Sequence, residues 1–103
     1  MNDDVISNNI TILIVLYKES YELISKTLKP INSFKKIIID NAGNQELKNK
    51  IQSNFYIEKY ILNKVNSGFS AGYDQAIKLS KTKYSLILAP DCIIQEKDIN
   101  LLL

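Results

Sequence analysis

The sequence predicts an α/β domain, a Rossmann-like, mostly parallel sheet of about four strands with helices on both faces. Apolar, β-branched runs of strand length alternate with amphipathic segments of helix length, and turn residues separate the two kinds of segment. The 103-residue chain is 46% hydrophobic and 23% charged, as expected for one small globular domain. We therefore expect residues 1–103 to form a single domain, with residues 1–9 as a flexible N-terminal segment.

The first half of the chain contains two strands and a helix between them. Ile10–Tyr17 is an almost continuous apolar run, which is typical of a strand covered on both faces of a parallel sheet. Glu19–Pro30 places Ile24 and Leu28 four residues apart with charged residues opposite, and this spacing predicts a helix closed by its proline. Lys35–Asp40 (KKIIID) is a second buried strand, and the turn residues NAGN end it.

The second half continues the alternation. The predicted elements are a weakly amphipathic helix over Gln45–Asn54, a strand over Tyr56–Asn63, a helix marked by Tyr73, Ala76, Ile77 and Ser80, a strand over Tyr84–Asp91 ended by Pro90, and a helix over Gln95–Leu103. This order predicts a parallel sheet joined by right-handed crossovers. Ile99, Leu102 and Leu103 share one face of the last helix. We expect further chain to cover that face, so that residues 1–103 are the front half of a larger domain; a short helix that caps the sheet is the alternative.

The composition excludes several function classes. The net charge is +2, with 13 basic and 11 acidic residues spread along the chain, so we expect no nucleic-acid partner. The chain has no histidine, and its one cysteine, Cys92, is expected to be a small buried hydrophobic residue. No secretory signal is visible, and the longest apolar run is too short to span a membrane. We expect a cytoplasmic protein, or one at the inner face of the membrane.

Polar stretches follow all four predicted strands. They read YKES, DNAG, NKVNSGFSAG and APDC in chain order. In open α/β sheets, ligands bind beyond the carboxyl ends of the strands, near the point where the strand order reverses. The sequence therefore predicts a ligand site where these stretches meet.

Two residues at the ends of the first two strands allow two readings each. Tyr17 can stack on a flat heterocycle, or it can simply end the strand and pack on the first helix. Asp40 can accept hydrogen bonds from the imide N–H of a uracil or thymine or from a ribose hydroxyl. It can equally cap the turn into the second helix.

The later stretches leave the same choice open. Gly68 and Gly72, two of only three glycines, lie between a strand and a helix, where bare amides and the helix dipole favour a diphosphate. A tight turn with close helix packing explains them as well. Asp91 follows Pro90 and can hold a divalent cation through one oxygen, or it can cap the last helix.

The four stretches together resemble the N-terminal half of family 2 glycosyltransferases. The matching segments are LYK, IIDNAG, NSGFSAGYDQA and LAPD, in family order. Those enzymes have the GT-A fold, invert the anomeric centre and use nucleotide-diphosphate sugars, and the most similar branch includes rhamnosyltransferases of bacterial surface polysaccharides. The resemblance implies that Tyr17 lines the base, Asp40 binds its imide or the ribose, and Asp91 meets the metal-diphosphate. The resemblance also implies that five further residues contact the nucleotide: Lys18, Asn41, Asn66, Gly68 and Gly72.

The sequence also departs from the family pattern. Ala89 stands where the first acidic or amide residue of the metal motif is usual, Lys18 replaces an asparagine and Ala76 replaces a glycine. The use of Mg²⁺ or Mn²⁺ and the choice of donor therefore stay open. The resemblance places the general base in a segment after the fourth helix, so residues 1–103 alone are expected to be inactive. The whole enzyme would transfer a sugar to a cell-surface glycan or a lipid-linked acceptor.

Two further hypotheses remain. One is a non-catalytic α/β interaction or regulatory module that kept the scaffold, and the other is an unrelated flavodoxin-like domain with another phosphate ligand. The sequence leaves the oligomeric state open.

Overall fold

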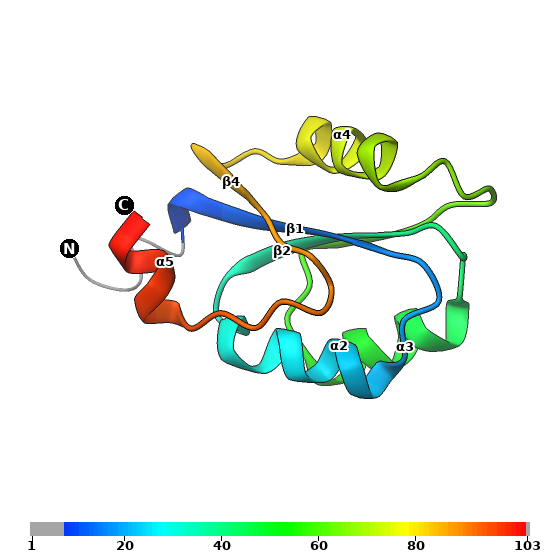
Figure 1. The fold of residues 1–103 in the computed structure, drawn as a ribbon, viewed down its shortest axis with the longest axis horizontal. Helices are drawn as coiled ribbons and strands as arrows, with labels where there is room; N and C mark the ends of the chain where they lie inside the picture. Colours follow the sequence, from blue (N-terminus) through cyan, green and yellow to red (C-terminus); the bar gives the residue numbers. More distant parts are fainter. Residues whose placement is uncertain (1–7, 103) are drawn as a thin grey trace.

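The structure, a computed structural model, describes residues 8–102 and confirms the α/β prediction (Figure 1). Most of the expected flexible N-terminal segment and Leu103 lie outside the described residues. The strands are β1 (Ile10–Leu16), β2 (Lys35–Asp40), β3 (Lys59–Leu62) and β4 (Tyr84–Ile87). The helices are α2 (Tyr21–Leu28), the short 3-10 helix η1 (Lys29–Ile31), α3 (Gln45–Asn54), α4 (Phe69–Leu79) and α5 (Glu96–Leu102).

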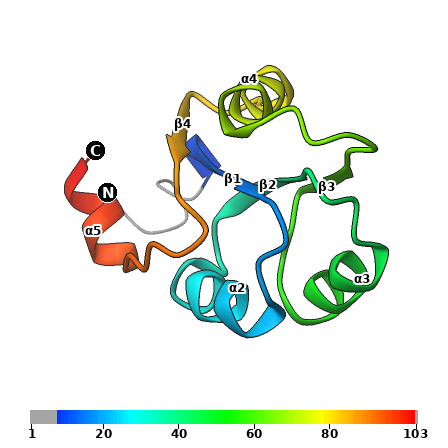
Figure 2. The same ribbon diagram turned by 45° about the vertical axis from the view of Figure 1, so that its right-hand side comes forward.

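The four strands are all parallel and lie in the order β3-β2-β1-β4. The chain moves outward from β1 to β2 and β3, and then returns past both to pair β4 with the other side of β1. A right-handed crossover in the reverse direction places its helix on the opposite face of the sheet. Accordingly α2 and α3 cover one face and α4 covers the other (Figure 2). The strand order reverses between β1 and β4.

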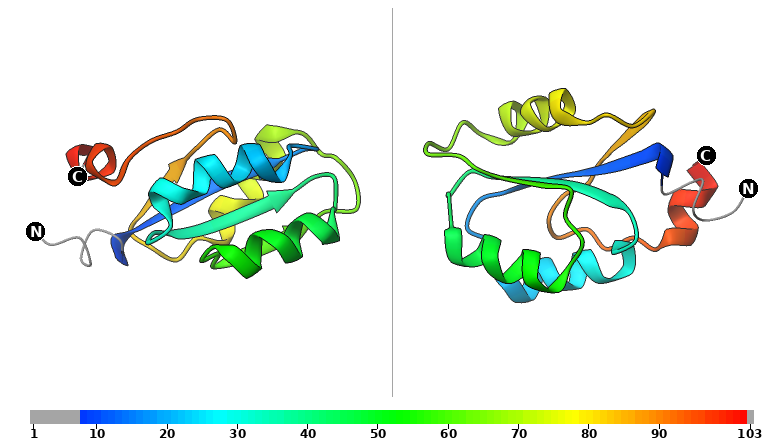
Figure 3. Two further views of the ribbon diagram at one scale, coloured as in Figure 1. Left: turned by 90° about the horizontal axis from the view of Figure 1, so that it is seen from below. Right: turned by 180° about the vertical axis from the view of Figure 1, so that it is seen from behind.

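Both faces of β1 are buried, as its continuous apolar run predicts. Ile12, Ile14 and Leu16 belong to the core beneath α2 and α3, whereas Leu13 and Val15 belong to the core beneath α4. This two-sided arrangement follows from the strand period of two, which sends successive side chains to opposite faces. The two layers on the sheet are visible in the right-hand view of Figure 3, where α4 lies above the strands and α2 and α3 lie below them.

Side-chain caps define where α2 and α3 begin. The Ser20 hydroxyl accepts a hydrogen bond from the Leu23 amide at 3.2 Å, and the Asn44 side chain accepts one from the Leu47 amide at 3.1 Å. Such caps satisfy amides that the first helical turn leaves unpaired. They fix where the chain leaves the carboxyl ends of β1 and β2.

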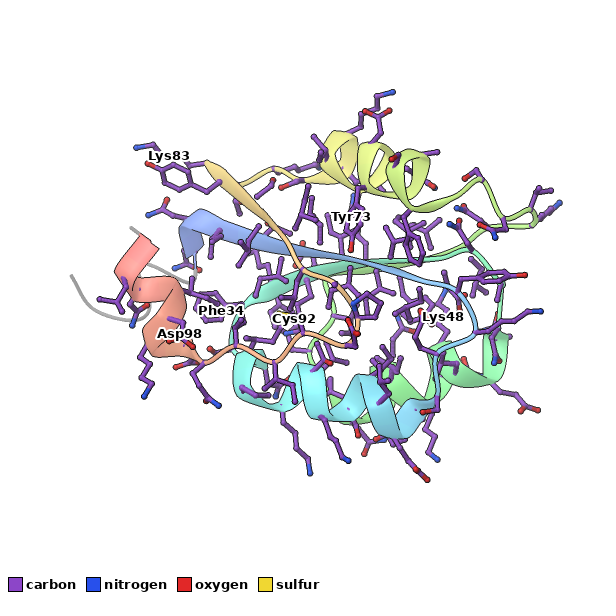
Figure 4. The ribbon with its side chains drawn as sticks, in the orientation of Figure 1. Phe34, Lys48, Tyr73, Lys83, Cys92 and Asp98 are labelled. Atoms are coloured by element: carbon purple, nitrogen blue, oxygen red, sulfur yellow. The ribbon has the colours of Figure 1, made fainter. Side chains whose placement is uncertain are left out.

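The fourth strand is shorter than predicted and lies at an open edge of the sheet. It ends at Ile87, and the next residue, Leu88, is buried and donates its amide to the Leu13 carbonyl at 3.0 Å. The chain then turns, and the Cys92 amide donates to the Ala89 carbonyl at 3.0 Å. The expectation that Cys92 is buried is therefore wrong, since it is exposed beyond this turn (Figure 4). The Thr27 hydroxyl donates to the Pro90 carbonyl at 2.6 Å and ties this turn to α2.

One lysine is fully buried in the layer beneath α2 and α3. The Lys36 ammonium donates to the carbonyl oxygens of Ile31, Asn32 and Phe34 at 3.2, 3.0 and 2.6 Å, and it lies 5.3 Å from the centroid of the Tyr56 ring. Burial lowers the pKa of Lys36 to about 7. All three ammonium donors have partners, so the lysine holds the end of η1 against β2.

Candidate functional site

The predicted site residues come together along one edge of the sheet, and Asn41 joins three of the segments. Its amide donates to the Leu16 carbonyl at 2.8 Å, which ties the end of β2 to the end of β1. Its side-chain amide donates to the Gly68 carbonyl at 3.1 Å. The stretches after β1 and β2 and the glycine loop therefore meet, as the strand-end rule predicts.

Asn41 belongs to a partly buried amide network that sequence reasoning missed. The Asn63 side chain donates to the Asn41 side-chain oxygen at 2.8 Å, and Asn63 and Gln75 exchange hydrogen bonds of 2.9 and 3.1 Å. This network links the loop after β2 to α4. Asn41 is buried within it, so its observed contacts position the glycine loop, and its contact with a nucleotide stays a prediction.

Asp40 is also satisfied within the protein. Only 1% of it is exposed, and its carboxylate accepts from the amides of Ala42 at 2.9 Å and Asn44 at 3.2 Å and from the Tyr60 hydroxyl at 2.9 Å. Burial and the Asp40 charge both raise the pKa of Tyr60, which keeps its hydroxyl a donor. These contacts are those of a turn cap. Because Asp40 is buried, a nucleotide could reach its carboxylate only if the residues that cover it moved.

Glycine occurs at residues 68 and 72 for two different physical reasons. Gly68 has a φ of 88°, a conformation that favours glycine, and a Cβ placed there would meet no atom within 4 Å. Its amide donates to the Asn66 side chain at 2.9 Å, and no side chain caps the α4 helix that begins after it. Gly72 instead faces β1, since a Cβ there would lie 2.8 and 2.9 Å from the two γ-carbons of Val15. Gly68 thus borders open space, whereas Gly72 lets α4 approach the sheet.

A cleft of about 440 Å³ lies where the strand order reverses. It is lined by Glu19 and Leu23 from the segment after β1, by Phe69 and Tyr73 from α4, and by Ala89, Pro90 and Asp91 after β4. A largely apolar cleft of this size at the switch point of an α/β sheet is a typical small-molecule site. Asp91 is the one predicted site residue in this lining. Figure 4 shows Tyr73 extending from α4 toward the sheet.

Tyr17 and Lys18 lie at the same edge but are not in the cleft lining. Tyr17 is 37% exposed, and the Lys18 ammonium lies 5.1 Å from the centroid of its ring. Lys18 adopts a φ of 69°, a left-handed conformation that turns the chain sharply after β1. The exposed Tyr17 ring is accessible for stacking, but it does not line the cleft.

Glu19 is a cleft residue that sequence reasoning did not identify, as are Leu23, Phe69 and Tyr73. Both carboxylate oxygens accept from the Tyr17 amide, at 2.6 and 3.2 Å. Burial raises the pKa of Glu19, the Tyr17 hydrogen bond opposes this rise, and the charges of Asp40 and Asp91 add to it. Its position in the YKES stretch was the available signal, but only the turn at Lys18 brings its carboxylate into the cleft.

The acidic residues of the cleft limit what metal site is possible. Among residues 8–102, no group of three or more histidine, cysteine, aspartate or glutamate side chains is arranged to hold a metal ion. Glu19 and Asp91 both line the cleft and offer oxygen ligands, and Ala89 offers none. Mg²⁺ keeps several waters and often shares one or two carboxylates with substrate phosphates. The residues present therefore fit a divalent cation only as part of a complex with a bound diphosphate.

Comparison with protein-family models, with curated proteins and with solved structures finds no match to this chain. Within the described residues, no helix combines the length and the apolar character needed to cross a bilayer.

Proposed function

We propose that this chain is the nucleotide-diphosphate-sugar-binding part of an inverting glycosyltransferase. The observation that carries this proposal is the position of the uncapped α4 N-terminus, next to open space at Gly68 and beside the cleft where the strand order reverses. The resemblance of the four strand-end stretches to family 2 glycosyltransferases supports the same assignment. The acceptor would be a cell-surface glycan or a lipid-linked sugar.

The diphosphate would lie against the first turn of α4. Unpaired amides and the positive end of the helix dipole favour an anion there. Asn66 holds the Gly68 amide, so the loop is already shaped by its own contacts. A Cβ placed at Gly68 would meet no atom within 4 Å, so a phosphate group has room to approach the backbone there.

Asp91, with Glu19 nearby in the cleft, would hold a Mg²⁺ or Mn²⁺ ion that a diphosphate shares. Such an ion would neutralise charge on the departing diphosphate in an in-line displacement at the anomeric carbon. The exposed ring of Tyr17 would stack on the base. Asp40 would contact the base or ribose only if the residues that cover its buried carboxylate moved.

A second candidate is a non-catalytic α/β interaction module. The burial of Asp40 and its three hydrogen bonds within the protein favour it, because the carboxylate then has a structural role that needs no ligand. The alanine at position 89 in the cleft favours it as well.

Calorimetric titration with UDP, dTDP and GDP, with and without Mn²⁺, separates the two candidates. We expect one nucleotide to bind, and the Asp91→Asn variant to weaken its Mn²⁺-dependent binding by at least tenfold. Asp74→Asn is the matched control, because Asp74 is an exposed aspartate on α4 that pairs with Lys78 and is not in the cleft lining. Absence of binding by all three nucleotides would reject the proposed function and favour the non-catalytic module.

A further inference from the structure

We propose that a small hollow at the amino edge of the sheet binds one free phosphate-type oxyanion through Lys35, Lys59 and Lys81. All four parallel strands begin at this edge, whereas the cleft lies beyond the edge at which they end. Three observations support the site: three lysines line one hollow, they lack ion-pair partners, and the volume of the hollow suits a single oxyanion. The site would be present whether or not the cleft binds a nucleotide sugar.

The register of the sheet brings two of the lysines to the same face. Lys59 begins β3 and is paired with Ile37 of β2, which belongs to the core beneath α4. Lys35 begins β2 and precedes Ile37 by two residues, so it lies on that face as well. Lys81 comes from the turn between α4 and β4 and lines the same hollow. Tertiary structure thus gathers three lysines from separate segments, and the two on the strands are partly buried.

The charges around the hollow favour an anion. Within residues 8–102, the one ion pair joins Lys78 to Asp74 on α4, so none of the three lysines is paired. Glu58 also lines the hollow, but its carboxylate accepts from the Tyr56 hydroxyl at 2.8 Å and forms no ion pair with them. The carboxyl end of α4 adds about half a negative charge. The hollow therefore keeps a net positive charge, and a bound anion would relieve the repulsion between the ammonium groups.

The volume and the hydroxyl groups of the hollow define the ligand further. The volume is about 60 Å³, and a water molecule occupies roughly 30 Å³ in the liquid, so the hollow accommodates one tetrahedral oxyanion and no nucleotide. In its wall, the Thr11 and Thr82 hydroxyl oxygens lie 2.6 Å apart, and the Thr82 hydroxyl donates to the Tyr84 carbonyl at 2.8 Å. Both hydroxyl protons are therefore used within the protein. The lysine ammonium groups, with three donors each, would supply the hydrogen bonds to the oxyanion.

Titration of the full chain with inorganic phosphate, followed by amide NMR, tests this site. Potassium chloride at matched ionic strength is the reference, because screening alone weakens the repulsion between lysines. We expect saturable shifts of the Lys35, Lys59 and Thr82 amides in phosphate, with half-saturation below about 10 mM. Lys35→Gln and Lys59→Gln should each weaken phosphate binding by at least about fivefold, because each loses one charge-assisted hydrogen bond. Lys48→Gln is the matched control, since Lys48 is also partly buried but lies on α3 and does not line the hollow.

Three results would overturn the site. The first is a phosphate response that stays linear up to about 50 mM, which indicates general salt effects. The second is equal phosphate affinity in the parent and in both lysine variants, with the dispersion of the amide spectrum showing that the variants are folded. The third is a set of saturable shifts confined to the first turn of α4, which would assign the phosphate to the helix N-terminus. Saturable shifts at the amino edge in a chain that binds no nucleotide would support the site and reject only the proposed function.

Discussion

The close approach of α4 to β1 depends on the absence of a side chain at Gly72, and a double-mutant cycle with Val15 tests this. A Cβ at residue 72 would lie 2.8 and 2.9 Å from the γ-carbons of Val15, which is fully buried between the sheet and α4. Overpacking of this kind costs about 1–3 kcal/mol. The substitution of glycine by alanine inside a helix stabilises the helix by about 1 kcal/mol. Gly72→Ala should therefore lower the free energy of unfolding by about 0–2 kcal/mol.

The second arm of the cycle removes the atoms that clash. Val15→Ala deletes two buried methyl groups and should cost about 2 kcal/mol from lost burial and the cavity left behind. In the double variant the methyl group of Ala at residue 72 enters the vacated space. The double variant should thus be more stable than the sum of the single effects by about 1–3 kcal/mol, which is the overpacking cost that is relieved and lies within the range of about 0.5–3 kcal/mol for residues in contact.

Urea denaturation followed by circular dichroism measures all four proteins of the cycle. The matched control combines Val15→Ala with Gly68→Ala, because a Cβ at residue 68 meets no atom within 4 Å. That pair should be additive within about 0.5 kcal/mol, even though Gly68→Ala alone is strained by its positive φ. Additivity of the Gly72 and Val15 substitutions within the same limit would refute the packing explanation for Gly72.

Two other substitutions test the buried polar groups. Because the pKa of Lys36 is about 7 in the folded protein and 10.5 in the unfolded chain, the unfolded chain binds more protons between these values, so stability contributed by this residue rises with pH across that window. From pH 7 to 10, the free energy of unfolding of the parent should therefore rise relative to that of Lys36→Met by up to about 1.4 kcal/mol per pH unit. Urea denaturation measures both proteins, and a difference that stays constant over this range would contradict the prediction. Tyr60→Phe removes one hydrogen bond to the Asp40 carboxylate and should lower the free energy of unfolding by about 1.5–3 kcal/mol at pH 7, since the acceptor is charged and buried. Retention of full stability would show that the two backbone amides alone satisfy Asp40.

Local patterns were sufficient to predict most of the fold. The unbroken apolar run of β1 predicted burial on both faces, and the boundaries of β2 at Lys35 and Asp40 and of α3 at Gln45 and Asn54 match the structure. These elements are determined by periodicity, caps and turn residues within a few positions of each other. The prediction was less accurate for β4. The predicted strand runs to Asp91, whereas the pairing of β4 with β1 ends at Ile87.

The arrangement of the site was only partly visible from the sequence. The strand-end rule correctly brought the stretches after the first two strands and the glycine loop together, because parallel strands share one carboxyl edge. Which side chains line the cleft could not be predicted. Asp40 and Asn41 turn into the protein and are satisfied there, whereas Glu19 enters the cleft because Lys18 adopts a left-handed conformation.

Composition and periodicity by themselves thus determined an α/β chain, its strands and helices, and the polar segments that end each strand. The tertiary structure alone decided that Gly68 borders open space while Gly72 packs on Val15, and that Glu19, Phe69 and Asp91 line one cleft. The physical reason is that periodicity reports only which face of an element is buried. The neighbours of a side chain in the cleft beyond the ends of β1 and β4 depend on strand order and helix approach, which are set by contacts between residues far apart in the chain.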